Sequence, residues 1–175
     1  MAINTHGGGA NTNRNGLRFE QETDLYEALT NIGFSISERN VVYDQNGHCL
    51  GIIAPKKQLY KLILEPEGID WRNYISKLLL PDEALLNLTN NTVYIIEKKF
   101  QNGSGSVDEK LQTCDFKKKQ YQKLFYDTNY RVEYIYVCNN WFQQECYRDV
   151  HDYIYSVGCH IFFNEIPLDF LELPF

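Results

Sequence analysis

The sequence lacks long hydrophobic runs. Its longest uninterrupted apolar stretches are about four residues, such as Val93 to Ile96, whereas a membrane-spanning helix needs about twenty. The first residues also lack the basic start and the apolar stretch of a secretory signal. We therefore expect no membrane span and a cytoplasmic location.

Cysteine pairs with a recognisable spacing are also absent. The chain has five cysteines, an odd number, and no Cys-x-x-Cys motif. This pattern excludes a disulfide framework and a typical structural zinc site. We expect reduced and mostly buried thiols.

A surplus of basic residues is missing as well, because the formal net charge is -6. Phosphate binding normally draws on excess Lys and Arg, so this balance taken alone argues against a nucleic-acid partner. Two observations reduce its weight. Carboxylates around a divalent cation count as negative only when that ion is absent, and three lysines are clustered at 117–119. An average over the chain does not describe one cleft.

The composition that is present indicates one packed domain. Of the 175 residues, 43% are hydrophobic and 14% are aromatic, which is enough for a single substantial core. Residues 1–16 are rich in Gly, Asn and Thr and cannot bury much surface. We expect a flexible N-terminal tail over 1–16 and a single domain over 17–175.

Hydrophobic periodicity predicts alternating helices and strands. Leu25, Ala28, Leu29 and Ile32 share a helical face before Gly33, and Asn46-Gly47 separates two apolar stretches, as in a hairpin. Ser106 and Glu109 have the spacing of a capping box at a helix start. The expected segments are a helix over 17–32, a hairpin over 41–50, an extended piece over 58–64, strands over 82–88 and 92–100, a helix over 106–126 whose buried face carries Leu111, Cys114, Leu124 and Phe125, a strand over 131–138, a helix over 143–157 and a strand over 159–163. This order predicts an α/β sandwich with a mixed sheet and helices on both faces.

Three charged residues stand at the ends of two neighbouring strands of this prediction. Asp82 opens one strand, and Glu97 and Lys99 close the next. Side chains two apart on a strand share a face, so Glu97 and Lys99 project to the same side and Lys98 to the other. If the two strands form a hairpin, Asp82 lies across from the Glu97 end. The result is a carboxylate pair beside one lysine.

This set of groups suits phosphodiester hydrolysis. Two hard oxygen ligands fit Mg²⁺, which keeps several waters and contacts substrate phosphate. A metal held by Asp82 and Glu97 lowers the pKa of a bound water and polarises the phosphate, and Lys99 orients that water or stabilises the developing charge. Each residue then has a distinct role.

The same residues resemble a known family. Pro81-Asp82, then 97–99 at the end of a β-rich run, then the helix start at 106–110 are similar to the PD-(D/E)XK nuclease superfamily, most closely its small type II restriction endonucleases. The resemblance covers about residues 14–138. It implies a restriction-endonuclease-like three-layer sandwich with a core order of helix, three strands, helix and strand.

The resemblance also implies an activity and partners. It implies Mg²⁺-dependent cleavage of double-stranded DNA, with Mn²⁺ able to substitute, by a homodimer that reads a short palindrome. Members often carry a Glu in the first helix that joins the metal site, and Glu20 is the matching residue here. A Glu in a first helical turn is also favoured by the helix dipole without any function.

Competing interpretations apply to the other charged residues. On a strand, a triplet of an acidic residue, any residue and Lys often forms only a solvated face. Two other triplets of this kind, at 108–110 and 115–117, fall in a predicted helix, where residues two apart do not face each other. Only 97–99 follows an apolar strand. Glu83 should point away from Asp82, as a surface carboxylate.

Two further DNA-binding candidates remain open. Gln101 is two residues after Lys99, so it projects to the same face if the strand extends that far. In that case it contacts the phosphate or a metal-bound water. The run Lys117, Lys118 and Lys119 forms either a solvated helix face or a ridge that contacts phosphates.

Two rival functions also remain. One is a DNA repair or recombination nuclease without sequence specificity. The other is a binding or interaction module that kept the fold and lost the chemistry, against which the complete set of Asp82, Glu97 and Lys99 argues.

Overall fold

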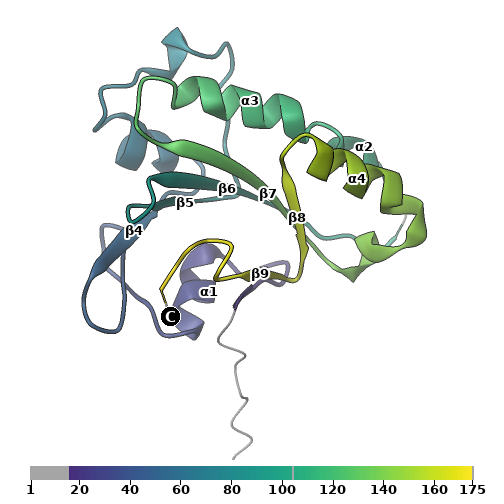
Figure 1. Cartoon of the computed structure of the whole chain (residues 1–175), viewed down its shortest axis with the longest axis horizontal. Coiled ribbons are helices and arrows are strands. Elements are labelled where there is room, and N and C mark those ends of the chain that lie inside the picture. Colours follow the sequence, from purple (N-terminus) through teal and green to yellow (C-terminus); the bar gives the residue numbers. More distant parts are fainter. Residues whose placement is uncertain (1–15, 104, 175) are drawn as a thin grey trace, which may run out of the picture.

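A mixed seven-stranded sheet forms the centre of the molecule in the computed structural model, which describes residues 16–103 and 105–174 (Figure 1). The strand order is β2-β3-β4-β5-β6-β7-β8, antiparallel as far as β6 and parallel from β6 to β8. The strands are β2 (Ser35–Ile36), β3 (Val41–Tyr43), β4 (Cys49–Ile53), β5 (Glu83–Asn87), β6 (Thr92–Lys99), β7 (Arg131–Cys138) and β8 (His160–Phe163). A separate two-stranded ribbon pairs β1 (Gly16–Arg18) with β9 (Glu165–Pro167).

Helices cover both faces of this sheet (Figure 1). On one face lie α1 (Leu25–Asn31) and the β1–β9 ribbon, and on the other lie α2 (Val107–Leu111), α3 (Cys114–Leu124) and α4 (Arg148–Ser156). Two hydrophobic clusters fill the layers because strand side chains alternate between faces. On β6, for example, Val93 and Ile95 belong to one cluster, and Tyr94 and Ile96 to the other. The predicted α/β class and mixed sheet are confirmed.

The predicted hairpins are present. The β3–β4 pair is closed by a turn whose Gly47 has a φ of +81°, and β5 pairs with β6 across 88–91. The strands expected over 131–138 and 159–163 correspond to β7 and β8. Within the described residues, no helix is long and apolar enough to cross a membrane.

The first predicted helix is shorter than expected. It begins at Leu25, where the carboxylate of Asp24 accepts a hydrogen bond of 2.7 Å from the Glu27 amide and caps the helix. The preceding Leu17 and Phe19 are both buried, and this spacing of two is typical of a strand rather than a helix. Gly16 therefore belongs to β1, and the rest of the tail expected over 1–16 lies outside the described residues.

The extended piece expected over 58–64 is wrong. It is instead a turn of π-helix, Leu59–Leu64. Its buried residues are Leu59, Tyr60, Ile63 and Leu64, which recur at the four-residue spacing of a helical face. A short 3-10 turn, Trp71–Asn73, follows.

The helix expected over 106–126 is divided into α2 and α3. The Thr113 hydroxyl donates a 2.7 Å hydrogen bond to the Lys110 carbonyl, a local bond that competes with a continuous helix. Ser106 makes no side-chain capping bond, so the capping-box prediction is wrong. The buried face was correctly predicted, because Leu111, Cys114, Leu124 and Phe125 are all in the core.

The helix expected over 143–157 is also shorter. Regular α-helix covers only α4, and two 3-10 turns precede it, Asn140–Gln143 and Glu145–Tyr147. Gln144 between the turns has an extended backbone, with ψ of 149°, which interrupts the helical run.

Candidate active site

The β5–β6 hairpin brings Asp82 and Glu97 together. In the antiparallel register Glu83 pairs with Ile96. Asp82, one residue before Glu83, therefore lies opposite Glu97, one residue after Ile96. Directly opposed residues of an antiparallel pair share a face. Lys99 is on that same face because it lies two residues after Glu97. The predicted juxtaposition is therefore present.

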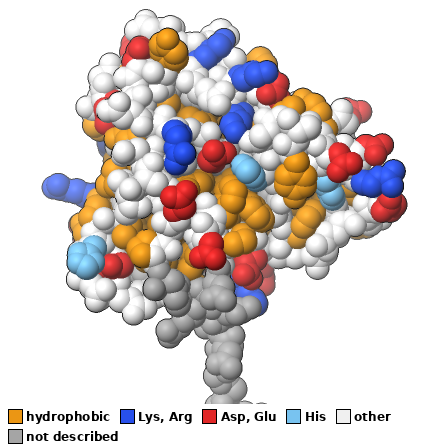
Figure 2. Space-filling view, in the orientation of Figure 1, with side chains coloured by type: hydrophobic (Ala, Val, Ile, Leu, Met, Phe, Trp, Pro, Cys, Tyr) orange, Lys and Arg blue, Asp and Glu red, His pale blue; other side chains and the backbone are white. Residues whose placement is uncertain are grey.

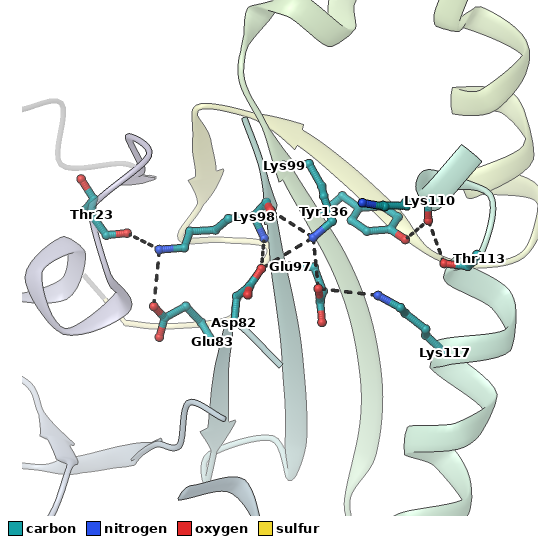
Figure 3. A network of polar contacts seen from close by, with 10 residues as sticks. All are labelled: Thr23, Asp82, Glu83, Glu97, Lys98, Lys99, Lys110, Thr113, Lys117 and Tyr136. Atoms are coloured by element: carbon teal, nitrogen blue, oxygen red, sulfur yellow. Dashed lines mark hydrogen bonds and ion pairs between the residues drawn. The ribbon is translucent and has the colours of Figure 1, made fainter. Parts of the chain in front are cut away.

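The ammonium group of Lys99 lies among three oxygen atoms (Figure 3). Its Nζ is 3.2 Å from Oε2 of Glu97, 3.6 Å from Oδ2 of Asp82 and 3.0 Å from the Lys98 carbonyl oxygen. The three oxygens come from the ends of two neighbouring strands. This corner of the sheet already accommodates a positive charge.

Asp82 is held by the backbone of the facing strand. Its Oδ2 accepts a hydrogen bond of 2.9 Å from the Lys98 amide. The Asp82 side chain is 37% exposed, whereas those of Glu97 and Lys99 are 10% and 17% exposed. The site therefore opens to solvent on the Asp82 side and is closed around Glu97.

The three lysines of the 117–119 run point in different directions. Lys117 reaches from α3 toward the site, with Nζ 3.7 Å from Oε2 of Glu97 (Figure 3). Lys118 contacts Glu133 at 3.4 Å and the Gly158 carbonyl. Lys119 pairs with Asp115 at 2.7 Å on the helix exterior. The run is therefore not a single ridge, and only Lys117 adds charge to the site.

Buried tyrosines form the wall on the α3 side. The Tyr136 ring lies below Lys99, with Nζ 5.9 Å from its centroid, and the hydroxyl donates to the Lys110 carbonyl. Burial raises the pKa of Tyr121, Tyr134 and Tyr136, and the nearby Glu97 carboxylate raises each further. These hydroxyls are protonated at neutral pH and supply no competing charge.

Glu20 is not placed as expected. It precedes α1 rather than lying on it, is exposed, and borders a pocket of about 590 Å³ together with Phe100 and Asn164. The carboxylate at the start of the first helix is Asp24, which lines another pocket, of about 480 Å³, together with Asp82. The expected position on the first helix is wrong because the prediction placed the helix start eight residues too early.

Gln101 lies beyond the end of β6. Its side-chain amide donates to the Gly103 carbonyl, and its backbone amide donates to Oδ1 of Asn139 at 3.2 Å. Because the strand ends at Lys99, the parity on which this candidate rested does not extend to residue 101.

An ion pair on the opposite face of the same strands was not anticipated. Glu83 is only 4% exposed, and its Oε1 lies 3.7 Å from Nζ of Lys98, which also donates to the Thr23 carbonyl at 2.9 Å (Figure 3). The expectation of a surface carboxylate is therefore wrong. The strand register indicates the burial of Glu83, because Glu83 pairs with the buried Ile96.

Burial changes the ionisation of this carboxyl. Desolvation, assisted by the carboxylates of Asp24 and Asp82, raises the pKa of Glu83 to about 7 against the opposing effects of Lys98 and of a hydrogen bond from the Leu25 backbone. Through the bond from Lys98 to the Thr23 carbonyl and the bond from the Leu25 amide to Glu83, the pair connects the start of α1 to the hairpin that carries the site.

The donor set suits a hard divalent cation with few protein ligands. No group of three or more His, Cys, Asp or Glu side chains that could hold a metal occurs in the part of the chain that the structure describes. The site supplies two carboxylates, Asp82 and Glu97, and the Lys98 carbonyl oxygen. Mg²⁺ commonly binds through one or two carboxylates and keeps several waters, so these residues fit it.

Comparison of the chain with protein-family models, with curated proteins and with solved structures finds no match. The assignment of a function therefore rests on the geometry of the site and on the resemblance of its residues to a known motif.

Proposed function

We propose that the protein is a Mg²⁺-dependent endonuclease that hydrolyses phosphodiester bonds of double-stranded DNA, as a sequence-specific restriction enzyme of the PD-(D/E)XK type. The observation that carries the proposal is the position of the Lys99 ammonium between the carboxylates of Asp82 and Glu97. All three side chains lie on one face, at the end of the central hairpin.

The order of elements supports the proposal. Five antiparallel strands, β2 to β6, follow α1, and α2 and α3 then lead to β7, which is parallel to β6. With the edge strands β2 and β3 set aside, this order contains the helix, three strands, helix and strand that the motif resemblance implies. The Glu-x-Lys triplet stands at the end of β6, the last of the antiparallel strands.

Each residue of the site has a role in this reaction. Asp82 and Glu97 would hold Mg²⁺, or Mn²⁺ in its place. When bound, the metal lowers the pKa of a coordinated water and neutralises charge on the scissile phosphate. Lys99 would donate a hydrogen bond to the attacking water or to a phosphate oxygen, and Lys117 would contact the phosphate from α3.

Local charge rather than total charge would hold the DNA. Figure 2 shows basic, acidic and hydrophobic side chains interspersed on the face in view, in keeping with the net charge of -6. At the site, Lys99 and Lys117 balance Asp82 and Glu97, so a bound divalent cation would leave a local positive excess. A homodimer would present two such centres to the two strands of a palindrome.

Incubation with supercoiled plasmid tests the proposal. We expect conversion to defined linear fragments with Mg²⁺ and none with a chelator, and sequencing of the ends should show one short motif. Random ends would favour a nuclease without specificity. Intact plasmid under every metal condition would contradict the nuclease proposal and favour an interaction module.

A further inference from the structure

A pocket lies at the carboxyl ends of the three parallel strands β6, β7 and β8. Lys99, Cys138 and Phe163 are register partners and end β6, β7 and β8. The residues that follow them, Phe100, Asn139 and Asn164, line the pocket of about 590 Å³.

Amide and aromatic side chains characterise the lining of this pocket. We call it the amide pocket and define it by Gln21, Phe100, Asn102, Asn139, Phe163 and Asn164. Its volume is within the range of about 300–1,000 Å³ that is typical of small-ligand sites. Amide groups donate and accept hydrogen bonds, and phenyl rings offer flat apolar contact.

The charge of the amide pocket argues against phosphate as its ligand. The remaining lining residues include Arg18, whose guanidinium is paired with Glu165 at 3.2 Å, and the additional carboxylate Glu20. One cation against two carboxylates leaves no positive excess. A neutral, flat ligand with donors and acceptors fits this environment, and a nucleobase has those properties.

Hydrogen bonds tie the backbone around the pocket to the ends of β6 and β7. The Asn164 amide donates to the Cys138 carbonyl at 2.8 Å, and its carbonyl accepts from Phe19 at 2.7 Å. The Asn139 side chain accepts a hydrogen bond from the Gln101 backbone amide and donates one to the Gln101 carbonyl. The Asn139 backbone amide donates to the Lys99 carbonyl at 3.3 Å. A fixed lining lowers the entropic cost of recognition.

We infer that the amide pocket binds a nucleobase of the DNA whose phosphate the proposed active site cleaves, and that adenine is the preferred base. Side-chain amides of Asn and Gln match the N6 and N7 edge of adenine. The Asn139 amide is already bonded to Gln101 and Asn102, and Nδ2 of Asn164 donates to Oδ1 of Asn140, so the groups that remain to read the base include Nδ2 of Asn102 and Oδ1 of Asn164. Phe100 directly follows Lys99 in the chain, and the Asn139 backbone amide donates to the Lys99 carbonyl, so the pocket adjoins the backbone of the proposed reacting residue. This inference rests on the proposed nuclease function.

Selection from a random duplex library tests the inference separately from cleavage. The probe is a duplex DNA library with a randomised centre, bound in Ca²⁺ and sequenced. The variants are Asn102→Ala, in an exposed loop, and Asn164→Gly, because Asn164 has a φ of +58° that glycine adopts without strain. Gln122→Ala, an exposed amide on α3, is the matched control.

We expect the wild type and the control to select a site with an A·T pair at one position. Both amide-pocket variants should reduce that preference about fivefold or more, with total DNA affinity changed by about twofold or less, as expected when phosphate contacts dominate affinity. Unchanged preference in both variants, or no preference in a wild type that cleaves plasmid with Mg²⁺, would overturn the inference and leave the nuclease proposal standing. No plasmid cleavage by the wild type would instead contradict the proposed function.

Discussion

The ammonium nitrogen of Lys99 lies 3.2 Å from Oε2 of Glu97, two residues earlier on the same strand. Because Asp82 faces both groups, removal of the ammonium leaves two carboxylates opposed in a partly closed site. We expect Lys99→Met to lower the free energy of unfolding of the metal-free protein by about 1–3 kcal/mol.

Divalent cations should reverse this loss. Thermal unfolding in EDTA and in Ca²⁺ measures the effect, and Ca²⁺ should raise the melting temperature of Lys99→Met more than that of the wild type. Lys123→Met, at an exposed position of α3, should behave as the wild type does. An equal response of Lys99→Met and wild type to Ca²⁺ would show that no cation binds between the carboxylates.

Lys98 should matter for stability rather than for chemistry. Its Nζ is the cation beside the buried Glu83, so Lys98→Ala leaves the Glu83 carboxyl in the interior without its cation. We expect a loss of about 3 kcal/mol in urea unfolding at pH 8. The double variant Lys98→Met with Glu83→Leu should recover to within about 1 kcal/mol of the wild type, because an apolar pair replaces the ion pair. No recovery in the double variant would mean that the ion pair has a role that packing cannot replace.

The role of Lys98 illustrates what the sequence could predict. The alternation of β6 correctly placed Glu97 and Lys99 on one face and Lys98 on the other. It did not reveal that the other face is buried at this point, because burial depends on where α1 packs. The misplaced start of α1 had the same origin: a strand of three residues, β1, is stabilised by its distant partner β9 and leaves little local signal.

The site was partly predictable for a related reason. A hairpin and its register are local, so the meeting of Asp82 with Glu97 follows from the turn and the pattern of alternation. The direction of Lys117 toward Glu97 was not predictable, since it depends on how α3 lies across the sheet. The placement of Glu20 on the first helix was wrong because it depended on a helix boundary, which sequence patterns locate poorly.

The three lysines of α3 should differ in their effect on DNA binding. Only Lys117 faces the site, so Lys117→Ala should weaken binding in Ca²⁺ and flatten the dependence of log affinity on log salt by about one unit. Lys119→Ala should change neither quantity measurably, because Lys119 pairs with Asp115 on the helix exterior. Fluorescence anisotropy of a labelled duplex across salt concentrations measures both. A larger effect of Lys119 than of Lys117 would contradict the assignment of Lys117 to the site.

The Glu133 carboxylate should make stability depend on pH under acid conditions. The hydrogen bond from His160, at 3.2 Å, and the charge of Lys118 hold the pKa of Glu133 below its usual value of 4.5. A depressed pKa stabilises the folded state above the unfolded-state pKa, and this contribution is lost as pH falls through the folded-state pKa.

Unfolding free energies of the wild type and Glu133→Gln test this expectation. The wild type should exceed the variant at pH 6, and the difference should shrink as pH falls below about 4.5. Glu109→Gln, at an exposed position of α2, should show no such trend. A wild-type advantage that persists undiminished to pH 3 would indicate that Glu133 contributes through packing rather than through its charge.

The most direct test of the proposed catalytic centre is the single-turnover rate of plasmid cleavage in Mg²⁺ for Lys99→Met, Glu97→Gln and the double variant. Groups that act together at one centre give strongly non-additive losses. We expect each single variant to lose about 10³-fold or more in rate, the double variant to lose little further, and all three to retain DNA binding in Ca²⁺. Cleavage near the wild-type rate by either single variant would contradict the assignment of Glu97 and Lys99 to one catalytic centre.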